Sequence, residues 1–283
     1  MKQTPSLTQR LLTHCGLSAI GAYACVVLLT VAPVSLRAQI QPKAPSGKIY
    51  VAGLEGGAQI FTGDKIEALT LKSVYVAQRT AIETNPHGTL AMVFSNGTGI
   101  SLDPETHIDV KRFTQEPFVA SRTDLELEPS VSQTEVFVAH GTLAVSTSKL
   151  AAGSVMTYLT PLGSINLHGG KVVIEMEGGL SKISVLEGEG TVRGGEVDLG
   201  GKVIHAGEQA ISRPGPPGEP NIVIIEKIPA GELAMLEEKD DLAYQARKTV
   251  FFETDGTGEI TVAPVVPASV PVQATISPAK LPN

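Results

Sequence analysis

Residues 82–118 hold two apolar-rich runs that meet at Asn96-Gly97. An Asn-Gly pair between such runs strongly indicates an antiparallel hairpin, because both residues tolerate the positive φ angles of a tight turn. A two-residue loop would place Val93 opposite Ile100. The first run is apolar on both faces and is expected in the interior. The second alternates, so we expect it to be half exposed.

Short apolar runs separated by glycine continue through residues 48–212. Segments such as 171–177 and 180–187 are rich in β-branched residues and have the length of strands. Many short strands with frequent turns predict an all-β fold, namely an antiparallel sandwich or roll. The expected turns include the glycine pairs Gly56-Gly57, Gly169-Gly170, Gly178-Gly179, Gly194-Gly195 and Gly200-Gly201.

The first 38 residues read as an export leader. Lys2, Arg10 and Arg37 are their only charged residues, and the uncharged run 17–36 lies between them. A positively charged start followed by an apolar stretch is typical of a signal peptide, and cleavage after Ala38 is expected. The alternative is an uncleaved anchor, since about 20 apolar residues can span a bilayer.

Charge and cysteine content limit the partners and the stabilising bonds. Cys15 and Cys25 both lie in the predicted leader, so a cleaved product has no disulfide and no thiol ligand. The leader holds three of the 22 basic residues and none of the 29 acidic ones, which leaves a net charge near −10 on the remaining chain. No basic cluster and no Trp is present, so we expect no nucleic-acid partner.

The C-terminal part differs in composition. Residues 230–248 are dense in Glu, Leu, Ala and Lys and predict a helix with a weak apolar stripe, Leu233, Leu236, Ala243 and Tyr244. Prolines 264, 267, 271, 278 and 282 indicate a flexible tail. The predicted organisation is therefore a leader or anchor at 1–38, a linker at 39–47, a β domain at 48–229, a helix at 230–248 and a Pro-rich tail at 249–283.

Four potential metal ligands alternate near the second run of the hairpin: Asp103, Glu105, His107 and Asp109. They would project from one face of a strand, which raises the possibility of a cation site. Apolar residues occupy the intervening positions 102, 108 and 110, as in a strand with one dry and one wet face. We therefore favour a solvated face and expect no bound metal and no cofactor. Zinc is disfavoured further by the single histidine in this set.

Catalytic motifs are lacking. The sequence has no G-x-S-x-G nucleophile elbow, no H-E-x-x-H, no P-loop and no dinucleotide fingerprint. We expect no enzymatic activity. The alternative is a carbohydrate-active or metal-dependent envelope enzyme that uses the acidic residues of the 102–110 strand, because paired carboxylates about 5 to 10 Å apart can cleave a glycosidic bond.

Several sequence blocks occur in the order found in FecR-like domains, which are known from bacterial envelope proteins. They are residues 63–64, 81–84, 94–98, 138–145, 160–161, 169–170, 185–188 and 206–209. Over residues 48–212 the chain thus resembles this family. The resemblance implies an all-β periplasmic domain without catalytic residues. In the best-known members this domain senses a transducer and relays the signal to a cytoplasmic segment that holds a sigma factor.

The chain departs from that architecture because only 16 residues precede the apolar run. We therefore expect no sigma-factor-binding region of its own. The expected function is an exported binding, scaffolding or signalling-associated module that contacts another envelope protein or a polysaccharide. Membrane contact is expected only through an uncleaved N-terminal segment, and the oligomeric state is left open.

Overall fold

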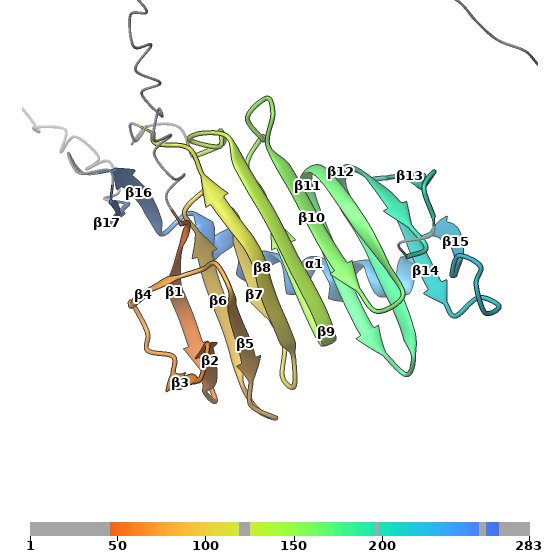
Figure 1. The fold of residues 1–283 in the computed structure, drawn as a ribbon, viewed down its shortest axis with the longest axis horizontal. Coiled ribbons are helices and arrows are strands. Elements are labelled where there is room, and N and C mark those ends of the chain that lie inside the picture. The colour runs from red at the N-terminus through yellow and green to blue at the C-terminus, as the bar shows by residue number, and fades with distance from the viewer. Residues whose placement is uncertain (1–45, 119–124, 196–197, 255–258, 266–283) are drawn as a thin grey trace, which may run out of the picture. The chain divides into compact units, whose positions relative to one another are not determined.

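The computed structural model describes residues 46–118, 125–195, 198–254 and 259–265 (Figure 1). The predicted leader at 1–38, most of the linker and the chain beyond residue 265 lie outside the described residues. Within these ranges the chain forms 17 strands and one helix, so the all-β prediction is confirmed. The elements are β1 (Lys48–Glu55), β2 (Ala58–Thr62), β3 (Lys65–Ala68), β4 (Val74–Val76), β5 (Thr80–Thr84), β6 (Thr89–Phe94), β7 (Gly99–Leu102), β8 (His107–Gln115), β9 (Ser132–Ser146), β10 (Val155–Thr160), β11 (Gly163–Glu177), β12 (Leu180–Arg193), β13 (Lys202–His205), β14 (Glu208–Arg213), β15 (Ile222–Lys227), α1 (Ala230–Arg247), β16 (Val250–Thr254) and β17 (Ile260–Pro264).

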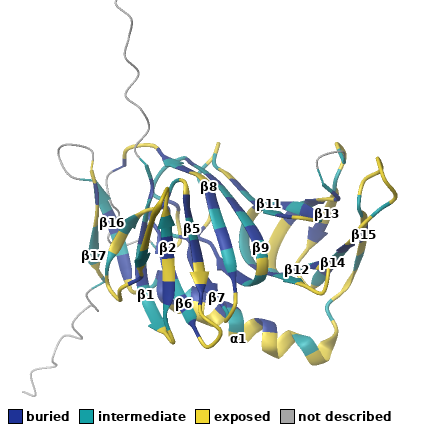
Figure 2. Ribbon diagram, turned by 60° about the horizontal axis from the view of Figure 1, so that its bottom comes forward, coloured by how far each residue is buried: buried dark blue, intermediate teal, exposed yellow. Residues whose placement is uncertain are grey.

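Strands β1 to β15 form one sheet that folds over into two layers. The first layer has the order β3-β2-β5-β8-β9-β10-β11-β12-β13, and the second has the order β4-β1-β6-β7-β9-β11-β12-β14-β15. Buried side chains of both layers meet in one large apolar cluster. The buried residues of both layers are dark blue in Figure 2. In it the rings of Phe94 and Phe113 stack across the interior with centroids 4.9 Å apart. The pairing is antiparallel throughout, except that β9 and β10 run parallel.

Three long strands, β9, β11 and β12, belong to both layers because each bends at glycine. Residues 132–138 of β9 pair with β8 and β10, whereas residues 141–146 pair with β7 and β11. Gly170 of β11 lies opposite Gly188 of β12, with φ angles of +110° and +84°. A β-carbon at either glycine would overlap a backbone carbonyl oxygen of the opposing strand. The prediction of a turn at Gly169-Gly170 is therefore wrong, since these residues mark a bend inside β11.

The hairpin at Asn96-Gly97 is present, but its register differs by one residue from the predicted one. Met92, and not Val93, lies opposite Ile100. The loop holds three residues in place of two, and its last residue, Gly97, has a φ of +84°. This is the geometry of a type I turn followed by a left-handed bulge residue, which Asn-Gly permits equally well.

Helix α1 lies across the outer face of the second layer (Figure 1). Gly99 of β7 allows the close approach, because a β-carbon there would collide with the carbonyl oxygen of Ala243. Leu236 packs against Ala144 and Val173 of the sheet. All four residues of β7 are consequently buried, so the prediction of a half-exposed strand is wrong. Within the described residues, no helix has both the length and the apolar character needed to cross a bilayer.

Strands β16 and β17 pair as a separate antiparallel hairpin, where the sequence predicted a flexible tail from residue 249. That prediction is wrong for residues 250–254 and 260–264. Val250 and Phe252 pack with Val93 of β6, and Tyr50 of β1 borders the same cluster. The prolines suggested a tail, yet Pro264 stands at the end of β17, where a missing N–H is tolerated.

A buried carboxylate makes the docking of α1 depend on pH. Asp240 is only 1% exposed and pairs with Lys171 of β11 at 3.2 Å. Burial raises its pKa to about 6 despite the attraction of Lys171. The folded state thus binds the carboxyl proton of Asp240 more tightly than the unfolded state does. The contribution of the protonated Asp240 to the stability of the fold is therefore complete below about pH 4 and is lost as pH rises through 6.

We expect Asp240→Asn to raise the free energy of unfolding by about 2 kcal/mol at pH 8 and to change it little at pH 4, because asparagine has no charge to bury. Urea unfolding of both proteins across this pH range measures the difference. Two curves that run parallel from pH 4 to pH 8 would contradict the assignment.

Tyr158 carries a buried hydroxyl. Its side chain is 0% exposed, burial raises its pKa, and its hydroxyl has no hydrogen-bond partner within the described residues. An unpaired buried hydroxyl costs about 1 kcal/mol or more. We expect Tyr158→Phe to stabilise the protein by about 1 kcal/mol, as measured by its denaturation midpoint. A loss of stability would show that the hydroxyl has a partner.

Candidate functional site

The structure does not bring the four predicted metal ligands onto one strand. Only His107 and Asp109 belong to β8, whereas Asp103 and Glu105 lie in the turn that precedes it. Glu105 has a φ of +52°, which breaks the strand geometry. The alternation that the sequence suggested therefore does not exist before residue 107.

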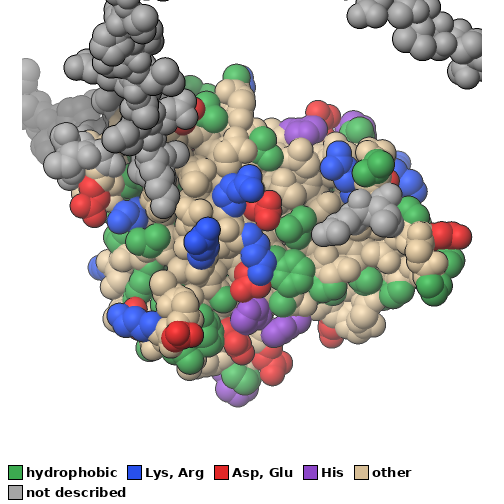
Figure 3. All heavy atoms as spheres, in the orientation of Figure 1, with side chains coloured by type: hydrophobic (Ala, Val, Ile, Leu, Met, Phe, Trp, Pro, Cys, Tyr) green, Lys and Arg blue, Asp and Glu red, His purple; other side chains and the backbone are tan. Residues whose placement is uncertain are grey.

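Three of these four residues, Asp103, His107 and Asp109, contact side chains of opposite or complementary charge. Asp103 pairs with Lys239 of α1, and Asp109 pairs with Lys111 at 2.8 Å. His107 contacts the carboxylate of Glu83 on β5 at 3.2 Å. Histidine and acidic side chains do gather on the face of the first layer that Figure 3 shows. No group of three or more His, Cys, Asp or Glu among the described residues could hold a metal ion.

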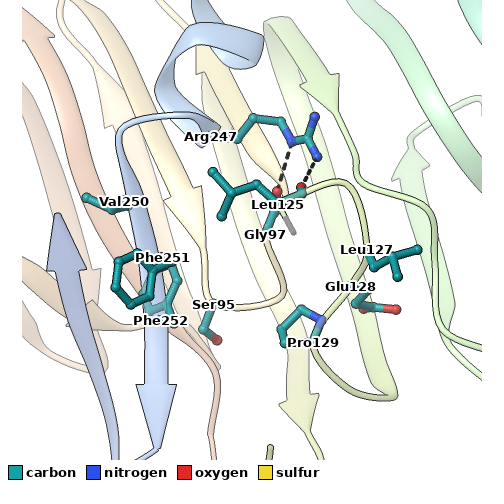
Figure 4. Close-up of a pocket in the computed structure, with 10 residues that line it drawn as sticks. All are labelled: Ser95, Gly97, Leu125, Leu127, Glu128, Pro129, Arg247, Val250, Phe251 and Phe252. Carbon is teal, nitrogen blue, oxygen red and sulfur yellow. Dashed lines mark hydrogen bonds between the residues drawn. The ribbon is translucent and has the colours of Figure 1, made fainter. Parts of the chain in front are cut away.

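A cavity of about 200 Å³ lies at the end of α1 (Figure 4). Three segments far apart in the sequence enclose it: the β6–β7 turn, residues 125–129 ahead of β9, and residues 247–252 at the end of α1 and the start of β16. Its lining residues are Ser95, Gly97, Leu125, Leu127, Glu128, Pro129, Arg247, Val250, Phe251 and Phe252.

Arg247 holds these segments together. It is the last residue of α1 and is only 3% exposed. Its Nε donates to the carbonyl oxygen of Gly97 at 3.2 Å, and its Nη2 donates to that of Leu125 at 2.6 Å. The guanidinium also pairs with Glu126 at 3.4 Å. The hydrogen bond from Lys248 and the charge of Arg247 lower the pKa of Glu126, so this carboxylate stays ionised at neutral pH.

Glu128 fixes the opposite side of the cavity. It is 7% exposed, and its carboxylate accepts hydrogen bonds from the hydroxyls of Ser132 and Ser154 and from the backbone N–H of Ala151. Asn96 donates to Ser132 at 3.1 Å and so connects this network to the β6–β7 turn. These bonds already occupy the carboxylate, which leaves it little capacity to act as a general base.

The rest of the lining is apolar and partly open. Phe251 and Phe252 come from β16, with Leu125, Leu127 and Pro129 on the facing segment (Figure 4). Leu127 is part of this lining and is 51% exposed. Cofactor and drug-sized sites usually have volumes of roughly 300–1,000 Å³. A cavity of about 200 Å³ is better suited to one or two apolar side chains.

The remaining polar lining residue, Ser95, is not an activated nucleophile. Its hydroxyl donates to Gln115 at 2.7 Å and accepts the backbone N–H of Lys48 at 3.1 Å. Nucleophilic catalysis requires a base within hydrogen-bond reach of the nucleophile. The described contacts of Ser95 include no such base, so Ser95 is not activated as a nucleophile in this arrangement.

No protein-family model matches the sequence, and no curated protein matches it. Two crystal structures of a candidate anti-sigma factor from Parabacteroides distasonis are similar to the fold, each at 15% sequence identity. The TM-scores are 0.38 and 0.39, and each match covers 54% of this chain. The matched part is 62% of that protein, so this chain spans less than two thirds of its length. Similarity at this level assigns neither a family nor a site, and the resemblance to FecR-like domains stays a prediction.

Proposed function

We propose that this protein is an exported, non-catalytic binding module of the bacterial envelope that holds an apolar side chain of a partner protein. The partner's side chain enters the cavity between Phe251, Leu127 and Arg247. The observation that carries this proposal is the chemistry of the lining, in which the charged groups are bonded within the protein and most of the free surface is apolar.

Apolar surface in a cavity favours the burial of an apolar ligand, because each Å² of apolar surface removed from water stabilises the complex by about 25 cal/mol. A protein segment supplies such side chains, whereas a glycan does not. Sugar-binding surfaces also need broad exposed aromatic platforms, whereas Phe252 is only 5% exposed and Phe251 is half-buried. We therefore favour a protein over a polysaccharide as the partner.

The enzymatic alternative depends on free carboxylates near residues 102–110. Asp103 and Asp109 are each paired with a lysine. Both carboxylates are thus engaged within the protein and are not the free pair that cleavage of a glycosidic bond needs. This arrangement supports the non-catalytic proposal.

Export is part of the proposal and is supported by the sequence of residues 1–38, with its basic start and apolar run. An association with envelope signalling would agree with the FecR-like blocks. The partner would then be another component of the signalling chain.

A photo-crosslinking amino acid at position 127 of the full chain tests this function in living cells. Leu127 is half exposed, so the label should be tolerated, and its side chain lies at the cavity. We expect one discrete adduct with an envelope protein. The matched control is the same label at Leu199, which is 88% exposed on the loop before β13 and should not trap that protein.

The absence of an adduct at position 127, or equal trapping at position 199, would contradict the proposed site. An adduct with a polysaccharide at position 127 would keep the site but reject the protein partner. Accumulation of the label in the cytosolic fraction would reject export.

A further inference from the structure

Strand β15 is an unprotected edge of the second layer. It pairs with β14, and no other strand of the described residues pairs with its outer side (Figure 1). Four consecutive aliphatic residues, 222–225, occupy most of its length. Ile222 and Ile224 are 38% and 44% exposed on one face. A long apolar edge of this kind is a template for pairing with another strand.

The other three edges of the two layers are protected. β3 and β4 have only four and three residues. On β3, Glu67 lies opposite the buried Ile60 and so faces inward. On β13, Lys202 lies opposite the buried Val192, and its amino group donates to the carbonyl oxygen of Val223 at 2.7 Å. Short strands and inward charges are known means of preventing edge pairing. β15, with six residues, carries the contact of Lys202 on the carbonyl oxygen of Val223, and just before the strand the N–H of Asn221 is bonded to the carbonyl oxygen of Gly194. Its residues 224–227 have no such cover among the described strands.

The free backbone groups of β15 alternate. The N–H of Ile228, just after β15, donates to the carbonyl oxygen of Gly207, just before β14. In an antiparallel ladder the backbone N–H and C=O groups of every second residue point to the same neighbouring strand. Counting back from Ile228, the backbone groups of residues 226, 224 and 222 therefore also point to β14. The N–H and C=O groups of Val223 and Ile225 then point to the free edge.

We propose that β15 pairs antiparallel with β15 of a second copy of this chain, centred on Ile224. In this register Ile224 lies opposite the partner's Ile224, and Val223 lies opposite the partner's Ile225. Their outward N–H and C=O groups therefore match. The second layer becomes one continuous sheet across the two-fold axis, and Lys202 is displaced from the Val223 carbonyl.

Side chains on the outer face fit this register. On the outer face Ile211 of β14 lies beside Ile224, so four isoleucines form one apolar row across the axis. In the next row across the joined sheet, Arg213 of β14 lies beside Ile222 of β15, and Ile222 lies opposite the partner's Glu226. Opposite charges thus fall in the same row of the joined sheet, two strands apart, and favour this register. An extended segment of an unrelated protein would need to supply the same pattern.

The contact is limited to one six-residue strand from each copy. Stable interfaces usually bury roughly 1,200–2,000 Å². The pairing is thus expected to exchange and is best trapped by a covalent bond. The interface is separate from the cavity, which lies at the other end of α1, so failure of either proposal leaves the other standing.

Disulfide trapping in the full chain tests the pairing, with Cys15→Ser and Cys25→Ser as the background. Directly opposite residues have β-carbons roughly 4.5–5.5 Å apart, within reach of a disulfide after small adjustments. We expect Ile224→Cys to give a disulfide-linked homodimer under mild oxidation. Ile222→Cys is the matched control on the same face of the same strand. Its two copies would lie about 13 Å apart, four residues along the strand, and should not link.

A second trap checks the register. The double variant Ile222→Cys with Glu226→Cys should restore the linked dimer, because those positions face each other across the axis. No linked dimer with Ile224→Cys, equal linking with Ile222→Cys alone, or a mixed disulfide with a different protein would overturn the proposal. Circular dichroism of each variant confirms that the sheet is intact.

Discussion

Replacing Gly170 by alanine is expected to lower the free energy of unfolding by about 4 kcal/mol. The φ of +110° at this residue is strained for any residue with a β-carbon, which costs about 1–3 kcal/mol. The new β-carbon would also overlap the carbonyl oxygen of Glu187 on β12, and overpacking adds about 1–3 kcal/mol. Guanidinium unfolding monitored by far-ultraviolet circular dichroism measures the loss.

Gly178→Ala is the matched control for this change. Gly178 also has a positive φ, +59°, but a β-carbon there would meet nothing within 4 Å. Gly178→Ala should therefore lower the free energy of unfolding by about 1 kcal/mol, the cost of placing alanine in a left-handed backbone conformation. If Gly170→Ala destabilises no more than Gly178→Ala, the bend that joins the two layers at Gly170 and Gly188 is not as described.

Replacing Arg247 by alanine is expected to cost about 3 kcal/mol of stability. The side chain is buried and donates to two carbonyl oxygens, those of Gly97 and Leu125, which would lose their partner. A buried acceptor left unpaired costs about 1–3 kcal/mol. Hydrogen exchange of the backbone in residues 125–131 should accelerate more than exchange in β12, because this connection loses its attachment to α1.

Two further variants separate the fork geometry of Arg247 from its charge. Arg247→Lys keeps the charge but cannot reach both carbonyl oxygens with one planar group, so we expect it to recover less than half of the loss. Arg213→Ala removes an exposed arginine from β14 and should change stability by less than about 0.5 kcal/mol. Full recovery by lysine would show that Arg247 acts through its charge alone.

The class of fold could be predicted because its cause is local. Glycine-separated runs of β-branched residues specify strands, and the Asn96-Gly97 pair specifies a hairpin. The register could not be predicted, because the same pair fits a two-residue loop and a bulged three-residue loop. The burial of β7 was missed for a different reason. Its outer face is covered by α1, which lies about 140 positions later in the chain.

The cavity was missed because its three walls meet only in the folded chain. Arg247 stood at the end of a predicted helix, and Phe251 and Phe252 were assigned to a flexible tail. A sequence signal did exist. Residues 250–254 and 260–264 are strand-like runs with two adjacent phenylalanines, separated by a glycine-rich turn sequence. The prolines beyond them outweighed this pattern.

Whether the cavity receives a partner's side chain is tested most directly by the crosslinking yield at position 127 in two further variants. Phe251→Asp places a charge in the cavity wall, and Phe61→Asp makes the same change at another half-buried phenylalanine, on β2. We expect Phe251→Asp to abolish the adduct and Phe61→Asp to leave it at the wild-type yield. An unchanged yield with Phe251→Asp, in a protein whose circular dichroism is intact, would contradict a partner bound in this cavity.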